Sequence, residues 1–468
     1  MELLDGNVSA MSSALLRKDI RAVDLVEASL GRIAELDDVL QAFITLDPEG
    51  AYTAAHEADA KLQAGVIDKP LLGIPIAIKD VTRTKGLRTT QGSRLYKDFV
   101  PEADEESVSR LRMAGAIIVG KTNTPEFAFG AVCTNPLRGP TCNPWNPSLT
   151  SAGSSGGSAV AVSTGMVPVA QGTDFGGSVR TPASFCGCIG LRPTPGVIPE
   201  PGRSLGWSAL STQGVLARSV QDAALMVSAM AGPHRDDPVS QLSRWPEKAR
   251  SGPFRVAASA SLGGAFRIDD SVEEAFDTAC FDAAKILGKR PVIVEPDLGD
   301  AVTAFKILRA AESWVKFGAM VTENEPNLTP SYVWNVRQGA ELTAEDYLRA
   351  EMVRTSVWRA FQRLFENYDI LMLPSASVMP FPNEQGEVQT VGSLPCESII
   401  DYLACTFLVS LVGFPAISIP APRGAEELPF GVQLVARPGE EASLLGAAIQ
   451  LEEGGFCHVR PPVWPRHV

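Results

Sequence analysis

Short apolar runs alternate with stretches of helical periodicity along most of this chain. The clearest run, Gly73-Ile-Pro-Ile-Ala-Ile-Lys-Asp80, has the length and the branched side chains of a buried strand rather than a helix. Strands are also predicted at residues 116–119, 167–171, 254–259, 292–294, 370–373, 416–420 and 430–435. Helices are predicted within residues 8–36, 51–62, 107–114, 158–164, 270–287, 300–317, 343–366 and 440–451. This alternation predicts an α/β architecture built around one large sheet, with residues 233–253 as a surface excursion.

Charge and hydropathy argue against several functional classes. The 468 residues carry a net charge of −13, whereas nucleic-acid binders hold phosphate backbones with clustered Lys and Arg. No run approaches the roughly 18 apolar residues that a membrane-spanning helix needs. The segment Met1 to Ser13 also lacks the basic stretch followed by an apolar one that marks a secretory signal. We therefore expect a cytoplasmic protein with neither a nucleic-acid nor a membrane partner.

The eight cysteines are scattered, and only Cys186 and Cys188 form a close pair. A zinc site would need a second such pair, or histidines at ligand spacing. Small buried thiols in a reducing compartment are the simpler interpretation. We expect no metal site.

Two Gly/Ser-rich turns lie close together in the chain, each attached to predicted regular structure. They are Ser151-Ala-Gly-Ser-Ser-Gly-Gly-Ser158 and Gly172-Thr-Asp-Phe-Gly-Gly-Ser-Val-Arg180. A flexible linker, a phosphate cradle and a purely structural tight turn are alternatives, but neither turn matches the Walker or the full dinucleotide pattern. A serine that follows two glycines can have converging backbone N–H groups, which form an oxyanion hole. We favour this catalytic interpretation.

A nucleophilic serine needs a base, and histidine is the common one. The four histidines lie in a surface-type helix, in the polar excursion and in the C-terminal tail: His56, His234, His458 and His467. A lysine serves instead if burial keeps it neutral. Lys79, at the end of an apolar strand, is the best candidate; the alternative is a strand-end lysine that extends to solvent.

Several motifs in a fixed order resemble the signature of the amidase signature family. They are Gly153-Ser-Ser-Gly-Gly-Ser158, Gly172-Thr-Asp-Phe-Gly-Gly-Ser-Val-Arg180 and Pro182-Ala-Ser-Phe-Cys-Gly187, with support from Gly73 to Asp80, Gly120 to Glu126, Asn143 to Trp145, Gly190 to Thr194, Gly413 to Ser418 and Pro429 to Gln433. The resemblance is strongest from about residue 70 to about 220. It implies an α/β fold with a large central mixed β-sheet covered by helices on both faces. We expect a single domain over residues 1–468, with a signature core at about 70–220 and a variable pocket region at about 233–400.

The resemblance also implies a Ser–cis-Ser–Lys triad. Ser178 would be the nucleophile, Ser154, after a cis Gly153–Ser154 bond, the bridging serine, and Lys79 the base. The oxyanion would lie among the N–H groups of Phe175, Gly176, Gly177 and Ser178. No cofactor is implied, and homodimers are common among such enzymes.

Three positions depart from the family pattern. Ala152 stands where glycine is usual, which matters if that residue needs a positive φ. Phe175 stands where a smaller residue is common, so its ring is expected to narrow or line the pocket. Arg192 replaces the usual lysine, away from the inferred chemistry, and Asp174 and Arg180 are expected to hold the loop.

Substrate choice is less constrained. The resemblance places Phe127 to Cys133 along the site, with Ala128 facing the substrate. Four aromatic residues of the variable region, either pocket lining or plain core, are Trp314, Phe317, Tyr332 and Trp334. We expect hydrolysis of a small or aryl-bearing amide. The alternatives are the glutaminase subunit of a tRNA-dependent amidotransferase and a catalytically inactive binding protein.

Overall fold

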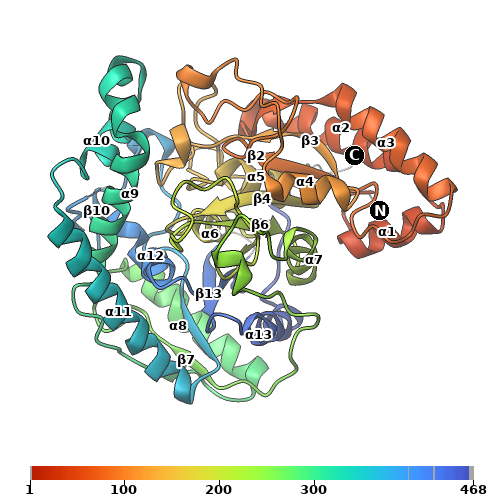
Figure 1. Ribbon diagram of the computed structural model, residues 1–468. Coiled ribbons are helices and arrows are strands. Elements are labelled where there is room, and N and C mark those ends of the chain that lie inside the picture. The colour runs from red at the N-terminus through yellow and green to blue at the C-terminus, as the bar shows by residue number, and fades with distance from the viewer. Residues whose placement is uncertain (1–2, 399, 425–426, 463–468) are drawn as a thin grey trace.

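A computed structural model of the protein describes residues 3–398, 400–424 and 427–462 (Figure 1). Within these residues, eleven strands form one sheet in the order β1-β3-β2-β4-β6-β5-β12-β13-β9-β7-β8. Their bounds are β1 (Phe43–Leu46), β2 (Pro75–Lys79), β3 (Ile117–Thr122), β4 (Val169–Asp174), β5 (Ile189–Arg192), β6 (Thr212–Ala217), β7 (Val256–Ala258), β8 (Val292–Ile293), β9 (Ile370–Pro374), β12 (Ala416–Pro420) and β13 (Gly431–Val435). A separate ribbon pairs β10 (Thr390–Val391) with β11 (Leu394–Pro395).

The sheet is mixed. Strand β2 pairs in parallel with β3 and β4, and β7 pairs in parallel with β8 and β9. Between these two parallel groups the strands from β4 to β9 pair antiparallel, as β1 does with β3 at one edge. The predicted active-site lysine therefore lies in a parallel, fully buried part of the sheet.

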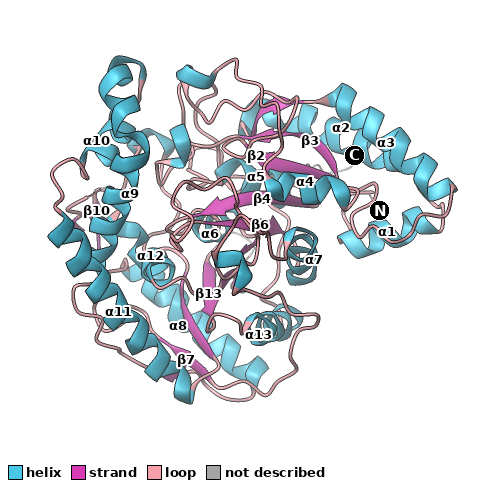
Figure 2. Ribbon diagram, viewed as in Figure 1, coloured by secondary structure: helices cyan, strands magenta, loops and turns pink. Residues whose placement is uncertain are grey.

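Thirteen α-helices surround the sheet within the described part of the chain (Figure 2). Their bounds are α1 (Val8–Leu16), α2 (Ala22–Leu40), α3 (Pro48–Gln63), α4 (Glu106–Met113), α5 (Gly156–Ser163), α6 (Arg180–Cys186), α7 (Val220–Met230), α8 (Asp270–Leu287), α9 (Ala301–Asn324), α10 (Pro330–Arg337), α11 (Ala344–Asn367), α12 (Ala404–Leu411) and α13 (Glu441–Glu453). Helices α9 and α11 lie side by side, and α10 packs on α9.

Alternating side chains of β9 show that helices cover both faces. Ile370 and Met372 pack in the apolar cluster that includes residues of α8 and α13. Leu371 and Leu373 pack instead with residues of α9, α11 and α12. Because successive side chains of a strand point to opposite faces, these two helix groups lie on opposite sides of the sheet.

This arrangement confirms the predicted fold class. The predicted strands and helices all appear, with ends shifted by a few residues, and residues 233–253 form the predicted excursion with a single short 3₁₀ turn. The structure adds elements that the sequence pattern did not predict, namely β1, β5, β6, β10, β11, α6, α7, α10 and α12. No helix in the described ranges is long and apolar enough to cross a bilayer.

Candidate active site

Lys79 ends β2, and its side chain is fully buried. The strand Pro75-Ile-Ala-Ile-Lys79 lies between β3 and β4, and all five residues are buried because both faces of the sheet are covered here. The lysine is carried into the interior by the apolar strand that precedes it. The alternative of a lysine extended to solvent is therefore wrong for Lys79.

The Lys79 amine has three hydroxyl neighbours. Its Nζ lies 2.7 Å from Ser154 Oγ, 2.9 Å from Ser155 Oγ and 2.9 Å from Thr173 Oγ1. Burial lowers the pKa of Lys79 to about 7, because a charged amine loses its hydration in the interior. A neutral amine is therefore well populated near neutral pH, and it can accept a proton from a hydroxyl group.

Ser154 lies at the start of the segment that leads into α5. The Gly153–Ser154 peptide bond is cis, and Ala152 just before it has a φ of 59°. Ala152 therefore adopts the left-handed conformation that glycine takes more readily. The position where the family usually has glycine does need a positive φ, and alanine adopts it here. Ser155 N–H donates to Ser178 O at 3.0 Å, so the two Gly/Ser turns contact each other directly.

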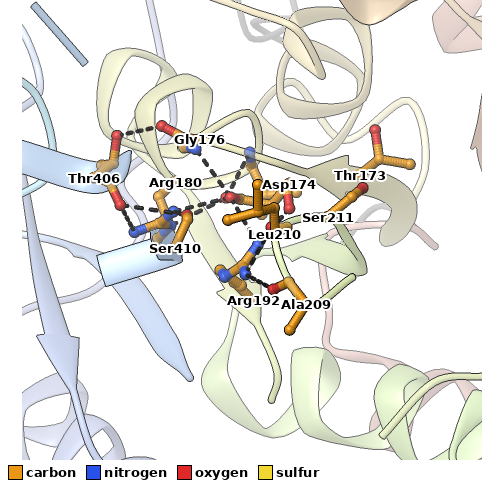
Figure 3. A network of polar contacts seen from close by, with 12 residues as sticks. Thr173, Asp174, Gly176, Arg180, Arg192, Ala209, Leu210, Ser211, Thr406 and Ser410 are labelled. Atoms are coloured by element: carbon orange, nitrogen blue, oxygen red, sulfur yellow. Dashed lines mark hydrogen bonds and ion pairs between the residues drawn. The ribbon is translucent and has the colours of Figure 1, made fainter. Parts of the chain in front are cut away.

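The turn from β4 into α6 carries Ser178, and Asp174 holds it in place (Figure 3). The Asp174 carboxylate accepts hydrogen bonds from Gly177 N–H at 2.9 Å and Val179 N–H at 3.2 Å. Arg180 donates to the same carboxylate at 3.0 and 2.9 Å, and Arg192 approaches it at 3.3 Å. Burial alone would raise the pKa of Asp174, but the two guanidinium charges hold it well below its usual range.

Arg180 also ties the turn to α12. Its guanidinium donates to Thr406 O at 2.9 Å and to Ser410 Oγ at 2.7 Å, and Thr406 Oγ1 donates to Gly176 O at 2.7 Å (Figure 3). Arg192 reaches back to the carbonyl groups of Asp174 and Leu210. The two arginines thus fix the loop that carries Ser178.

The N–H groups near Ser178 are not equivalent. Gly177 donates its N–H to Asp174, as described above. Among the described contacts, the N–H groups of Phe175, Gly176 and Ser178 have no protein acceptor, and the Ser178 hydroxyl has no hydrogen-bond partner. These three N–H groups are available to a developing oxyanion.

A cavity of about 290 Å³ opens beside these groups. Ser154, Thr173 and Ser178 line one part of it, and aromatic rings line much of the rest. The rings are those of Phe127, Phe129, Phe175, Phe305, Phe317 and Phe407. An apolar wall with a few polar groups at one place is typical of a small-molecule site.

The structure brings most of the predicted pocket residues to this cavity. Phe127, Ala128, Phe175 and Phe317 all line it. Cys133 and Trp314 do not, which corrects the expectation that they do.

The two corrected residues have other neighbours. Cys133 is buried beneath α5, where its thiol lies 3.4 Å from Thr141 Oγ1. Trp314, on α9, packs closely against Gly339. A Cβ added to Gly339 would lie 2.6 Å from the Cβ of Trp314. Of the other two aromatic candidates, Tyr332 is buried and packs on Phe127, and Trp334 is partly exposed.

Sequence reasoning missed a charged stripe on α9. Arg309, Glu312 and Lys316 line the cavity together with Phe305. Phe305, Arg309, Glu312 and Lys316 follow one another at intervals of four, three and four residues, which places all four on one helix face. That periodicity is the signal that could have found them.

None of the histidines in the described part of the chain lines the cavity. His458 contacts Gly187 O at 2.8 Å, and His234 lies in the excursion. His467 is outside the described residues. In the same described ranges, no group of three His, Cys, Asp or Glu side chains is placed to hold a metal ion.

Comparison with known proteins gives consistent matches over nearly the whole chain. A family model described as Amidase matches residues 24–445. A glutamyl-tRNA(Gln) amidotransferase subunit from Geobacter metallireducens is 34% identical, over 98% of this chain and 99% of that protein. A solved chain from a vestigial protein complex, described with the evolutionary origins of an s-triazine catabolic enzyme, superposes with a TM-score of 0.89 at 29% identity over 97% of this chain and 99% of that one. A crystal structure of an amidase superposes with a TM-score of 0.85 at 28% identity over 96% and 99% of the two chains.

Proposed function

The chain belongs to the amidase signature family and is thus an amidase, and on that premise we propose that it hydrolyses a small or aryl-bearing carboxylic amide through an acyl-enzyme on Ser178. The products are a carboxylate and either ammonia or an amine. The observation that carries the proposal is the buried contact of 2.7 Å between Lys79 Nζ and Ser154 Oγ, beside the cavity that Ser178 lines.

The proton path follows from these positions. Neutral Lys79 accepts the proton of Ser154, which accepts the proton of Ser178 as the Ser178 oxygen attacks the amide carbon. The oxyanion of the tetrahedral intermediate accepts hydrogen bonds from the free N–H groups around Gly176. Ser154 then returns a proton to the leaving nitrogen, and water hydrolyses the acyl-enzyme.

Aromatic rings around the cavity support the choice of a small or aryl-bearing acyl group. Phe305 and Phe407 stack with ring centroids 4.1 Å apart, and Phe175 meets Phe305 edge-on at 5.9 Å. A planar substrate group gains from offset or edge-to-face contact with such rings.

The experiment that tests the proposal measures ammonia or amine release from aliphatic, aryl and amino-acid amides, glutamine included. Wild type is compared with Ser178→Ala and with Ser163→Ala, a buried serine on α5 that does not line the cavity. We expect release from simple amides by wild type and Ser163→Ala, and none by Ser178→Ala. Activity that survives in Ser178→Ala would overturn the proposed mechanism.

The acyl pocket is tested by a matched pair of aromatic truncations. Phe175→Ala, which opens the cavity wall, is expected to change the ranking of aryl over aliphatic amides by about tenfold, the cost of losing one buried aromatic contact. Trp314→Ala removes an aromatic side chain that does not line the cavity, so the ranking should stay as in wild type. A ranking unchanged by Phe175→Ala would count against an aryl pocket.

A second candidate function is the glutaminase subunit of a tRNA-dependent amidotransferase. It is supported by the 34% identity, over 98% of this chain, to an amidotransferase subunit. This function predicts ammonia release from glutamine alone, increasing when partner subunits and tRNA are added. Hydrolysis of simple amides by the isolated chain would decide for the first candidate.

A further inference from the structure

Helix α9 places a guanidinium group in the wall of the cavity that Ser178 also lines. Arg309 is half-buried there, and its guanidinium carbon lies 5.4 Å from the centre of the Phe129 ring. This cation–π contact uses the face of the guanidinium group and leaves its N–H donors to form hydrogen bonds. Its one hydrogen bond to protein in the described contacts is to Asn335 Oδ1.

No carboxylate pairs with Arg309 among the described residues. A guanidinium has five N–H donors, so most of its donors remain unused. Burial lowers the pKa of Arg309 to about 10, which keeps it charged at neutral pH. A charge that has lost part of its hydration gains from a counterion, and Arg309 has none among the described residues.

The other arginines near the site differ in this respect. Arg180 and Arg192 are fully buried and share the carboxylate of Asp174. The acidic residue nearest to Arg309 along the same helix face is Glu312, and its carboxylate accepts from Ser208 Oγ instead. Lys316, one turn beyond, is exposed at the rim of the cavity.

We propose that Arg309 binds a carboxylate group of the substrate, and that the enzyme therefore favours amides that carry a second, anionic carboxylate. This inference rests on the proposed amide hydrolysis and adds the chemical class of the substrate. Monoamides of dicarboxylic acids have both features: an amide carbon for Ser178 and a carboxylate for the guanidinium fork. The phenylalanine rings that line the same cavity suit an aryl spacer.

The test compares two substrates of similar shape, 4-carbamoylbenzoate and 4-methylbenzamide. Wild type should show a kcat/KM at least about tenfold higher for the carboxylate, as expected for a charged hydrogen bond. Arg309→Gln should abolish that preference by lowering kcat/KM for 4-carbamoylbenzoate, and Arg309→Lys should recover part of it. Arg359→Gln, an exposed arginine on α11 outside the cavity, is the matched control and should behave as wild type.

Binding to Ser178→Ala separates this inference from the proposed function. Calorimetry should show tighter binding of 4-carbamoylbenzoate than of 4-methylbenzamide, and loss of the difference when Arg309→Gln is added. Equal binding of the two compounds, or a preference that survives Arg309→Gln, would overturn the role of Arg309. Absence of any amide hydrolysis by wild type, with the binding difference intact, would overturn the proposed function and leave the carboxylate site standing.

Discussion

Lys79 and Lys121 lie on neighbouring parallel strands, and both amines are fully buried, yet their surroundings differ in kind. Lys79 Nζ hydrogen-bonds to three hydroxyl groups and lies beside the cavity. Lys121 Nζ contacts the carbonyl of Thr82 and the hydroxyls of Thr84 and Thr89, at 2.8 and 3.0 Å for the hydroxyls. The charge of the buried Asp80 also acts on Lys121.

The difference shows that burial alone does not make a lysine a base. Burial lowers the pKa of both amines to about 7, and a nearby carboxylate opposes that change at each, Asp174 at Lys79 and Asp80 at Lys121, so the pKa does not distinguish them. A backbone carbonyl has no proton to give, so the carbonyl contact of Lys121 can only hold the loop that follows β2. Both amines also contact hydroxyls, which can give and accept protons. Ser154 and Thr173 beside Lys79 line the cavity, whereas Thr84 and Thr89 beside Lys121 do not, which suits a relay at Lys79.

The largest expected effect tests the relay at Lys79. Lys79→Met keeps the volume and removes the base, so kcat should fall by about 10³-fold or more, since general-base catalysis contributes about 10²- to 10⁴-fold. The fold should persist because a buried amine is replaced by an apolar group. Steady-state kinetics and a thermal melt check both points; a variant that retains more than a tenth of the wild-type kcat would show that Lys79 is not the base.

Lys121→Met should show the opposite pattern. It removes the donor to Thr82 O, Thr84 Oγ1 and Thr89 Oγ1 and the positive charge that acts on the buried Asp80, which costs about 1 to 3 kcal/mol in the free energy of unfolding for each buried group left unsatisfied. The kcat of the folded fraction should stay within about tenfold of wild type, because Lys121 is outside the proposed relay. Urea unfolding and kinetics measure the two quantities, and a loss of kcat as large as that of Lys79→Met would make the lysines equivalent.

Neutralising Asp80 tests whether the negative charge of Asp80 accounts for the structural role of Lys121. Asp80→Asn in the Lys121→Met background removes the buried negative charge while an acceptor oxygen remains for Thr90 N–H. We expect recovery of about 1 to 3 kcal/mol in the free energy of unfolding, the desolvation cost of an unpaired group. The double variant is measured beside both single variants; no recovery would mean that Lys121 stabilises through its hydroxyl contacts alone.

The smallest effect is a pH profile. Lys79 accepts a proton only when neutral, and its pKa of about 7 lies far below that of an ordinary lysine. The kcat/KM should therefore be constant above pH 8 and fall about tenfold per pH unit below pH 7. Lys121→Met should leave this profile in place, and a profile that moved with Lys121 would assign the titration to Lys121 instead.

Much of the fold was predictable because the local pattern of apolar residues in the sequence matches the residues that are buried in the structure. Strand β2 is a continuous apolar run, and α8 begins and ends where its periodicity does. Strands β5 and β6 were not predicted, because glycines and an arginine interrupt their apolar pattern. Gly190 is required there by packing: a Cβ would lie 2.6 Å from Ala183 Cβ and 2.8 Å from Val179 O, contacts that no local pattern encodes.

The candidate site also has a part that the sequence predicted and a part that it did not. Motif order located Lys79, Ser154 and Ser178, and the structure places the amine of Lys79 against Ser154. The pocket wall depends on how α9 is rotated about its axis, and that rotation is set by tertiary packing. Phe317 therefore faces the cavity while Trp314, one turn earlier, faces Gly339. Arg309 was also missed because its position depends on this rotation. From the sequence alone, a charged residue in a helix is expected to face solvent.

The cavity takes its floor and its roof from separate stretches of chain. We call the cavity-lining segments that carry Ser154 and Ser178 the floor, and the cavity-lining residues of α9 the roof. Arg309 and Lys316 of the roof share no hydrogen-bond partner with the floor among the described contacts, and substitutions at such sites usually have additive effects. In evolutionary terms, selection can therefore alter the roof to admit a new substrate while the floor is conserved, so a descendant enzyme changes its substrate and still cleaves an amide.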